Sequence, residues 1–416
     1  CDWASVEPSD TTPEHYDWSS LDSAITSVTD HGLELLMTMG GQPSWAAEYE
    51  MGPPYVTADL VEFMGALVER YDGDGVDDAP GSPVVRRFEL YNEPENYDTG
   101  RAGTGGYGYW GKNGAGYAAL LQTLHPVVKG ASPEAQLVFG GLAMDWCYGG
   151  GFDCDFLEDV LAACQGQDCF DVMNFHYFPY YRDNWESYGP DIMGKATYIR
   201  GLLSDYGFGD KPVICSEISH PGAGSLGSDE LQSRYVTKGY VRGRAADLDT
   251  VAWFLLLDGG WDPKRRGLLD SDRQPKPSYD AYRTMTAMLG DATFQRALTS
   301  EETGSTQVVG FRFERPEGGG WLDVVWTEDG YPFNAEDEPT MEVTLEVTSL
   351  RRVDKFGSAA WLQDEDDGAA DGQITLEVDG SPLYLDYGEP PEGWPEASFT
   401  TSSPDWLGQT TAFTNT

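Results

Sequence analysis

The sequence is poor in positive charge. Its 416 residues include 26 Lys and Arg against 70 Asp and Glu, so the formal net charge is −44. Because phosphate binding requires clustered Lys and Arg, this composition excludes nucleic acid as an expected partner. So much negative charge repels itself, yet it keeps a protein soluble where salt screens it. A salty habitat and an ordinary acidic secreted protein are both consistent with this charge.

Long apolar runs are also missing. The sequence has no stretch of about 18 apolar residues, so we expect no membrane span. A signal peptide is not visible at the start of the chain either. The composition is nevertheless 40% hydrophobic and 13% aromatic, which indicates a folded globular protein rather than a disordered one.

Cysteine is scarce, with six residues in the chain. Cys147 and Cys154 are close enough in sequence for a local disulfide, and so are Cys164 and Cys169. Two such disulfides favour an oxidising compartment, so we expect an extracellular or cell-surface protein whose signal peptide is not part of this chain. A zinc site made of these four residues is the alternative, but no CxxC pair or nearby His supports it.

Strand-like and helix-like segments alternate along residues 1–290. Strands are expected to end near residues 3, 39, 92, 141, 176, 217 and 257, with helices near 58–71, 116–130, 153–164, 192–206, 228–246 and 277–289. Such alternation predicts parallel βα units and the α/β class, here a (β/α)8 TIM barrel. An eight-stranded barrel needs one more strand end than these seven. We therefore expect the first βα unit to lie upstream of residue 1 and the catalytic domain 1–290 to be N-terminally truncated.

The pattern changes after residue 290. Short alternating runs separated by Gly, Pro and Asp occupy 308–314, 321–327, 341–348, 359–362, 374–378 and 383–385. These runs predict a small all-β sandwich domain over 291–390. Residues 391–416 are rich in Pro, Ser and Thr and are expected to form a polar tail.

Two glutamates stand at the ends of expected strands. Glu93 follows the apolar run 88–91, and Glu217 ends the run 212–217. In α/β barrels the C-terminal ends of the strands hold the chemistry. Retaining glycoside hydrolysis needs two carboxyl groups about 5–5.5 Å apart, one as acid/base and one as nucleophile. The alternative is that both are ordinary capping or surface acids in an acid-rich chain.

These motifs resemble those of known enzymes. Tyr91-Asn92-Glu93-Pro94, the strand-end Glu217 and Trp253 on the last strand are similar to clan A of the glycoside hydrolases. Segments 3–18 and 40–46 resemble members near families 39 and 5. The resemblance covers residues 1 to about 290, and the β domain that follows is similar to the one seen in family 39.

The resemblance implies specific roles. Glu93 would be the acid/base, Glu217 the nucleophile that forms a covalent glycosyl-enzyme, and Asn92 a substrate contact. No cofactor is implied. His176 would lie near the site, and Trp253 would be a platform under the sugar. The chain departs from the family pattern at His176-Tyr177-Phe178, so Tyr177 or Tyr180 would have to hold the nucleophile, or that contact would be absent; Tyr177 is also a candidate substrate contact.

Further aromatic residues are candidates for substrate binding. Trp45 and Trp261 lie in expected strand-to-helix loops, and aromatic faces stack well on sugar rings. For each of them, plain packing is an equal alternative. The same holds for His176 as a core histidine and for Trp253 as a residue of the barrel core.

The acidic stretch 72–78 resembles part of a calcium loop, with Asp72, Asp74 and Asp77 as candidate ligands. Pro83 stands where such a loop needs a Glu. The stretch also falls on a helix-to-strand connection, on the face opposite the catalytic rim. We therefore expect a solvated acidic turn, and any metal bound there would be structural.

The sequence as a whole predicts a retaining hydrolase of β-linked oligo- or polysaccharides, similar to a xylosidase or a glucanase, with carbohydrate as its partner. The main alternative is a carbohydrate-binding barrel without catalysis. A scaffold or adhesin that depends on its acidic surface is a third possibility. The identity of the sugar, the choice between exo and endo action, and the oligomeric state are not specified by these residues.

Overall fold

A computed structural model describes every residue except 98–108, 146, 148–150, 317–318, 329–337 and 389–416. The described chain divides into two compact units. The first contains Cys1–Tyr177 and Ala196–Glu217, and the second contains Phe178–Lys195 and the chain from Ile218 onward. The expected domain boundary near residue 290 stays a prediction, and the expected tail 391–416 lies outside the described residues.

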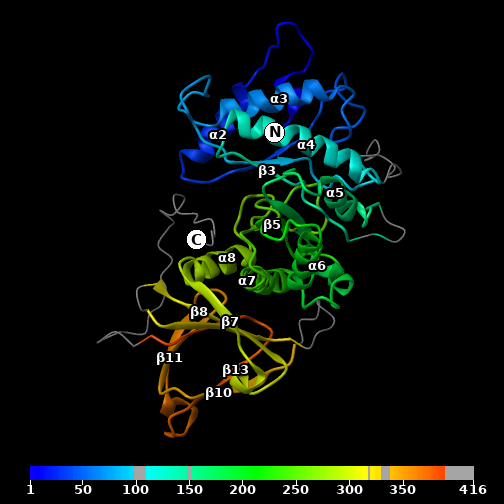
Figure 1. The fold of residues 1–416 in the computed structure, drawn as a ribbon. Coiled ribbons are helices and arrows are strands. Elements are labelled where there is room, and N and C mark those ends of the chain that lie inside the picture. Colours follow the sequence, from blue (N-terminus) through cyan, green and yellow to red (C-terminus); the bar gives the residue numbers. More distant parts are fainter. Residues whose placement is uncertain (98–108, 146, 148–150, 317–318, 329–337, 389–416) are drawn as a thin grey trace. The chain divides into compact units, whose positions relative to one another are not determined.

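The first unit consists of strands alternating with helices (Figure 1). The elements in chain order are α1 (Trp3–Val6), α2 (Ser19–Thr29), β1 (Leu36–Met39), α3 (Thr57–Arg70), β2 (Arg87–Leu90), α4 (Gly114–Ala131), β3 (Gln136–Val138), α5 (Phe156–Cys164), β4 (Met173–Tyr177), α6 (Ile192–Asp205) and β5 (Val213–Ile218). The alternation expected from the sequence is therefore confirmed here.

The strands of the first unit follow one another in chain order. β1, β2 and β3 form a parallel sheet in that order, with Arg87 of β2 paired to Leu36 and to Gln136. Isolated parallel bridges, Val138–Val172 among them, connect β3 to β4, and β4 lies next to β5. Because neighbouring parallel strands end at the same edge, the residues that follow β2, β3, β4 and β5 are brought together.

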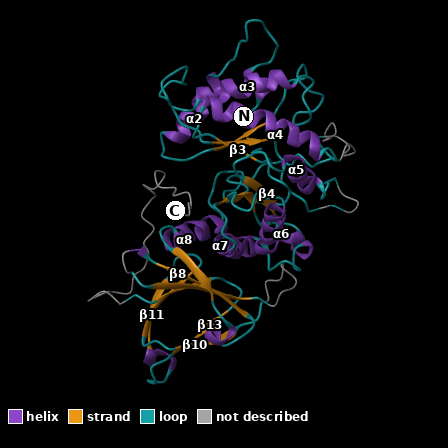
Figure 2. Ribbon diagram, viewed as in Figure 1, coloured by secondary structure: helices purple, strands orange, loops and turns teal. Residues whose placement is uncertain are grey.

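The helices of the first unit bury one apolar face each. In α3, Leu60, Phe63, Met64 and Leu67 are fully buried, at the spacing of a single helix face. The helix α4 begins at Asn113, whose side chain accepts the Gly116 N–H. Figure 2 shows α3 and α4 side by side against the sheet that contains β3. The two helices therefore bury this side of the sheet, and the ends of the strands remain available for functional residues.

The strand end expected near residue 3 is present as a single parallel bridge, and a short helix follows it directly. Residues Trp3–Val6 form the short helix α1, and a single parallel bridge joins Asp2 to Gly40. The indole of Trp3 donates to the Glu7 carboxylate at 2.8 Å and stacks on Phe63 with ring centroids 4.9 Å apart. These contacts anchor residues 3–7 as a helical turn directly after the bridge.

The second unit combines helices with an antiparallel β structure. The elements are η1 (Pro179–Asn184), α7 (Asp229–Ala245), β6 (Thr250–Trp253), α8 (Pro277–Leu289), β7 (Thr293–Ala297), α9 (Ser300–Thr303), β8 (Val308–Glu314), β9 (Trp321–Thr327), β10 (Met341–Leu345), β11 (Ser349–Asp354), β12 (Ala359–Gln363), η3 (Asp364–Asp367), β13 (Ile374–Val378) and β14 (Leu383–Asp386). A six-stranded sheet has the order β12-β11-β14-β9-β8-β7, and β10 pairs with β13. One apolar cluster, including Val325, Val343 and Leu376, joins strands of both sheets.

Two strands of this unit were not predicted. β7 is mostly exposed and is interrupted by a bulge between Phe294 and Arg296. β11 buries only Leu350 and Val353, three residues apart, so its sequence lacks the alternation on which the prediction relied. Pairing rather than local pattern fixes both: β7 pairs with the longer strand β8, and β11 pairs with β12 on one side and β14 on the other.

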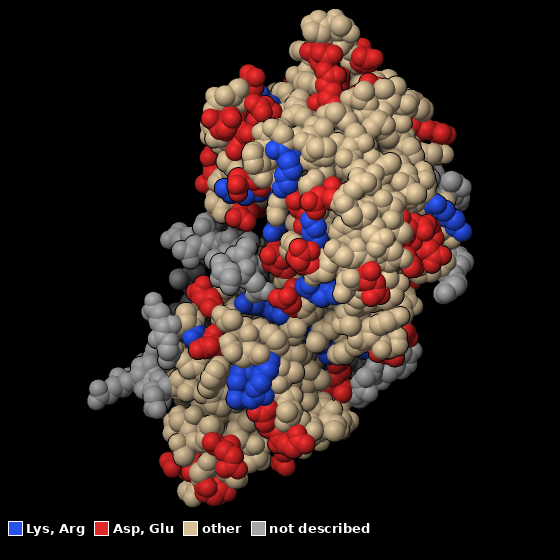
Figure 3. Space-filling model, viewed as in Figure 1, with Lys and Arg blue, Asp and Glu red and all other residues tan. Residues whose placement is uncertain are grey.

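Acidic side chains are spread over the face shown in Figure 3, where basic ones are fewer. The distribution agrees with the charge excess of the sequence. Among the helices of the described residues, none is both long and apolar enough to cross a bilayer.

Candidate active site

Glu93 follows β2 on a turn with an unusual backbone. Tyr91 and Glu93 both have left-handed φ angles, of 64° and 47°. Residues other than Gly adopt such angles rarely, and they do so most often where function holds them. The Glu93 N–H donates to the Gly141 carbonyl at 3.0 Å, and the Glu93 carbonyl accepts the Asn96 N–H at 3.0 Å. These bonds fix Glu93 against the segment that follows β3.

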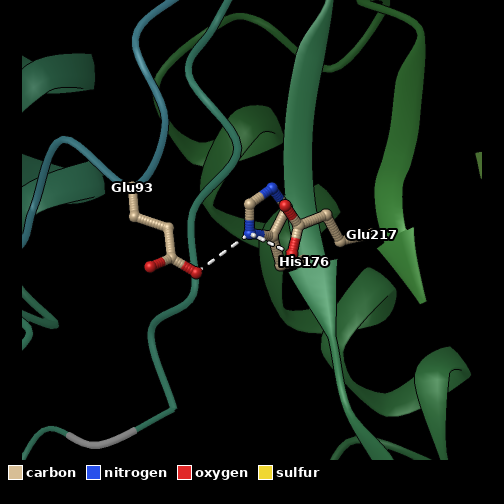
Figure 4. A group of neighbouring side chains, drawn as sticks. All are labelled: Glu93, His176 and Glu217. Atoms are coloured by element: carbon tan, nitrogen blue, oxygen red, sulfur yellow. Dashed lines mark hydrogen bonds and ion pairs between the residues drawn. The ribbon is translucent and has the colours of Figure 1, made fainter. Parts of the chain in front are cut away.

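Glu93, His176 and Glu217 come together from the C-terminal ends of β2, β4 and β5 (Figure 4). The His176 Nδ1 lies 3.0 Å from Glu93 Oε1 and 3.6 Å from Glu217 Oε2. One carboxylate oxygen of Glu93 and one of Glu217 lie within 4.8 Å of each other. The imidazole is 1% exposed, whereas the Glu93 and Glu217 side chains are 22% and 19% exposed. A substrate could therefore reach both carboxyl groups while the imidazole supports them from within.

The charge of His176 depends on its two acidic neighbours. Burial alone would lower the pKa of the imidazole. The negative charge of Glu217 and the hydrogen bond to Glu93 outweigh burial and raise the pKa of His176 from 6.5 to about 9. At neutral pH the ring is therefore a cation between two carboxyl groups.

Gly141 fixes the orientation of the imidazole. A Cβ on Gly141 would lie 2.2 Å from the His176 Nε2, so only glycine leaves room for the ring. The Gly141 N–H also donates to Glu89 Oε1 at 2.8 Å, and its carbonyl accepts from Glu93. One residue without a side chain thus connects Glu89, Glu93 and His176.

A buried polar network supports these residues. Glu89 is 2% exposed and accepts from the Thr38 hydroxyl, and the Asn174 amide donates to it at 2.7 Å. The same amide donates to the Ser216 hydroxyl at 2.8 Å. Burial raises the pKa of Glu89, against the hydrogen bonds that lower it. The network joins β1, β2, β4 and β5, so it holds in register the strands that carry the catalytic candidates.

Sequence reasoning missed this network, although a signal was present. Glu89 interrupts an apolar run, and Asn174 precedes His176 by two residues. Residues two apart on a strand share one face. A polar residue on a buried strand, in phase with a site residue, could have been identified as its support.

The other predicted site residues of the first unit, Asn92, Tyr177 and Trp45, differ from one another in burial and contacts. Asn92 is half-buried and forms a bridge with Gly141, next to Glu93. Tyr177 is fully buried, and as the residue after His176 it points to the opposite face of β4, which does not favour the predicted sugar contact. Trp45 is half-buried, packs edge-to-face on Trp3 at 5.5 Å and donates to the Glu7 carbonyl. The packing role of Trp45 is therefore confirmed, and its contact with a sugar stays a prediction.

The predicted aromatic contacts Trp253 and Trp261 belong to the second unit. Trp253 is half-buried on β6, and its indole N–H donates to the Arg266 carbonyl at 3.0 Å. Trp261 is 67% exposed, with its ring centroid 6.1 Å from that of Phe254. An exposed indole is available for stacking, whereas Trp253 already has a structural role.

The candidate calcium residues are only partly grouped. Asp72, Asp74 and Asp78 offer ligand oxygens within 4.8 Å of one another, and Asp77 does not belong to this group. Asp72 and Asp74 accept backbone N–H groups two residues ahead, as in a solvated acidic turn. Among the described residues, Glu93, His176 and Glu217 are also close enough together to hold a cation.

Two disulfides form as the cysteine spacing predicted. Cys147 is joined to Cys154, and Cys164 to Cys169. Cys215 is buried and belongs to neither disulfide, and its thiol donates to the Glu217 carbonyl at 3.3 Å. The zinc alternative is therefore wrong, since all four of its candidate ligands are used in disulfides.

Comparison with known proteins shows the fold. No protein-family model and no curated protein matches the sequence. Solved structures do match. A family 39 glycoside hydrolase from the gut symbiont Bacteroides cellulosilyticus WH2 is 21% identical, with a TM-score of 0.67 over 93% of this chain and 74% of that one. A glucosidase from Croceicoccus marinus is 13% identical, with a TM-score of 0.60 over 89% of this chain and 82% of that one.

A third match is a monomeric β-xylosidase from Caulobacter crescentus CB15, at 14% identity and a TM-score of 0.58, covering 89% of this chain and 84% of that one. These likenesses confirm the predicted fold class: the chain has the α/β fold of TIM-barrel glycoside hydrolases. The resemblance to family 39 that the motifs suggested is thus confirmed at the level of the fold.

Proposed function

We propose that this chain is a retaining β-glycoside hydrolase with Glu217 as nucleophile and Glu93 as acid/base. The observation that supports the proposal is the approach of the two carboxyl groups, whose nearer oxygens lie within 4.8 Å of each other. Retaining enzymes hold their carboxyl groups about 5–5.5 Å apart, whereas inverting enzymes need about 6.5–9.5 Å to admit a water. The short separation favours direct attack by one carboxylate.

The reaction would proceed in two displacements. Glu217 attacks the anomeric carbon while Glu93 gives its proton to the glycosidic oxygen, so the bond to the leaving group breaks and a glycosyl-Glu217 ester forms. Glu93, now ionised, then takes a proton from water, and the resulting oxygen attacks the anomeric carbon and releases Glu217. The imidazolium of His176 would keep Glu217 ionised before attack. These steps use no metal or cofactor.

The substrate would be a β-linked oligo- or polysaccharide. The matched structures include β-xylosidases and a xyloglucanase, which is consistent with a xylosidase-like or glucanase-like activity. Asn92 next to Glu93 is proposed to bind the sugar, with Trp45, Trp253 and the exposed Trp261 as aromatic contacts. We also propose that residues 291–390 form a β-sandwich domain.

Secretion is a further part of the proposal. The two disulfides are of the kind that persists in oxidising compartments. An acidic surface would keep such a protein soluble outside the cell.

The test is hydrolysis of a panel of aryl β-glycosides by the wild type, by an upstream-extended chain and by Glu217→Gln. We expect release from at least one sugar with retained anomeric configuration, and a loss of about 10⁴-fold or more in the variant. Glu134→Gln, at an exposed acid of the same unit, is the matched control. Sugar binding without hydrolysis would instead support the non-catalytic carbohydrate-binding barrel.

A further inference from the structure

Glu95 is a buried acid two residues beyond Glu93. Its side chain is 0% exposed, and its Oε1 accepts the Met144 N–H at 3.0 Å. Its Oε2 is buried and has no hydrogen-bond partner among the described residues. Burial, followed by the charge of Glu93, raises the pKa of Glu95 to about 8, so at neutral pH the group is mostly uncharged. Nothing in the proposed reaction uses this carboxyl group.

The partner of Glu95, Met144, lies shortly before Cys147, which is joined to Cys154 by a disulfide. Met144 has a left-handed φ of 46°. Its carbonyl oxygen lies 3.4 Å from the Cys147 sulfur and 3.5 Å from the Cys154 sulfur. The Met144 N–H is hydrogen-bonded to Glu95, and the Met144 carbonyl contacts the disulfide. Both contacts stabilise a backbone conformation that is unfavourable for methionine.

Backbone contacts join the same two segments. The Glu95 carbonyl accepts the Asp153 N–H at 3.1 Å, and Tyr97 donates to the Gly151 carbonyl at 2.7 Å. Asn96 also forms an antiparallel bridge with Phe152. The turn that carries Glu93 and the segment 144–154 thus form one connected surface, in which the Glu95 side chain is the buried link.

The position of Glu93 depends on the contacts that hold its turn. The side chain is 22% exposed, and the backbone has the left-handed φ described above. A general acid must lie within hydrogen-bond distance of the oxygen that it protonates, and an error of about 1 Å can cost about 100-fold in rate. Gly141 holds the turn from one side, and Glu95 holds it from the other.

We propose that Glu95 is a positioning residue for Glu93, whose carboxyl group fastens the Glu93 turn to Met144, next to the Cys147–Cys154 disulfide. The inference rests on the proposed function, because it assigns to Glu93 the role of acid. It adds a residue that the catalytic pair requires but that contacts neither substrate nor reacting atoms.

The first test uses the leaving group of the substrate. Protonation by Glu93 matters for a poor leaving group such as phenol and little for a good one such as 2,4-dinitrophenol. Glu95→Ala should therefore lower kcat/KM, which reports the first displacement, by about 10- to 100-fold on the phenyl glycoside and by less than about threefold on the dinitrophenyl glycoside. Glu95→Gln keeps an uncharged group with an acceptor for Met144 and should restore most of the rate. An equal loss on both substrates, or no rescue by glutamine, would overturn the proposal.

The second test does not depend on activity. The rate at which dithiothreitol reduces Cys147–Cys154 reports how firmly the segment is held, and Cys164–Cys169 in the same protein is the internal control. Glu95→Ala should accelerate the first reduction by about tenfold and leave the second unchanged, while Glu95→Gln should behave as wild type. Unchanged rates in Glu95→Ala would overturn the link whatever the enzyme hydrolyses. Accelerated reduction in a protein that cleaves no glycoside would instead mean that the proposed function alone has failed.

Discussion

The imidazole of His176 lies between two carboxyl groups, with Nδ1 3.0 Å from Glu93 Oε1 and 3.6 Å from Glu217 Oε2. Two ionised carboxyl groups this close would repel each other, and a buried cation between them offsets the repulsion. The strand β4 therefore contributes as much to the geometry of the pair as the two strands that carry the glutamates. The electrostatic balance of the site depends on the proton of this imidazole.

That dependence can be measured. Since the pKa of His176 is raised from 6.5 to about 9, its ring proton signals should titrate with a midpoint near 9 rather than near 6.5. The folded pKa is the higher one, so the stabilisation is fully present below pH 6.5 and is lost as the pH rises through 9. NMR titration of the histidine ring protons, assigned with His176→Asn, would give the midpoint.

Glu217→Gln is the informative partner in this experiment, because the Glu217 charge is the largest of the causes that raise the pKa. The midpoint should fall in this variant and stay near 9 in the control Glu134→Gln. A wild-type midpoint at or below 6.5 would mean that burial dominates and that His176 is neutral in the working enzyme.

Gly141 should tolerate no side chain. In Gly141→Ala the new methyl group would lie 2.2 Å from the His176 Nε2, so the imidazole must move away from both carboxyl groups. We expect a loss of about 1–3 kcal/mol in the free energy of unfolding and a much larger relative loss of kcat. Denaturant unfolding and aryl glycoside hydrolysis would measure the two effects.

Gly130 provides the matched control for that substitution. It lies in α4, and a Cβ placed there meets no atom within 4 Å. Gly130→Ala should raise the free energy of unfolding by about 0.5–1 kcal/mol, since alanine is the better helix residue, and it should leave kcat unchanged. If Gly141→Ala kept wild-type activity, the tight fit of His176 against the backbone would be disproved.

The parts of this site that could be predicted are those with local signals. Glu93 and Glu217 end apolar strand-like runs, and strand ends of a barrel meet at one rim, so their proximity followed from the sequence. His176 entered through the family pattern and lies between them. The helix α3 was equally predictable, because it buries one face at regular spacing.

The parts that could not be predicted depend on contacts between distant residues. Glu89 gains its partners Thr38 and Asn174 only after three strands pair in register. Glu95 gains Met144 only through the segment after β3. Tyr177 was assigned to the site, yet alternation along β4 turns it to the face opposite His176. The position of a residue along its strand could be predicted, but its contact partner on another strand or segment could not.

A buried ion cluster in the second unit should make that unit sensitive to acid. Arg242 is 3% exposed, donates to Asp191 at 2.8 Å and also donates to Glu328. Burial alone would raise the pKa of Glu328, but the charges of Arg242 and Lys238 outweigh it and lower the pKa from 4.5 to about 2. Because the folded pKa is the lower one, this stabilisation is present above pH 4.5 and is lost as the pH falls towards 2.

Trp326 reports on this cluster, because its buried ring lies 5.3 Å from the Arg242 guanidinium. Its fluorescence during denaturant unfolding at several pH values should show the free energy of unfolding falling as the pH drops from 4.5 to 2. Glu328→Gln leaves the Arg242 charge buried with one acidic partner fewer, which should cost about 3–5 kcal/mol at neutral pH and flatten the pH dependence. Glu377→Gln, at an exposed acid of β13, should change neither. A pH dependence that survives in Glu328→Gln would assign the acid sensitivity to other carboxyl groups, because a glutamine at this position has no proton to gain.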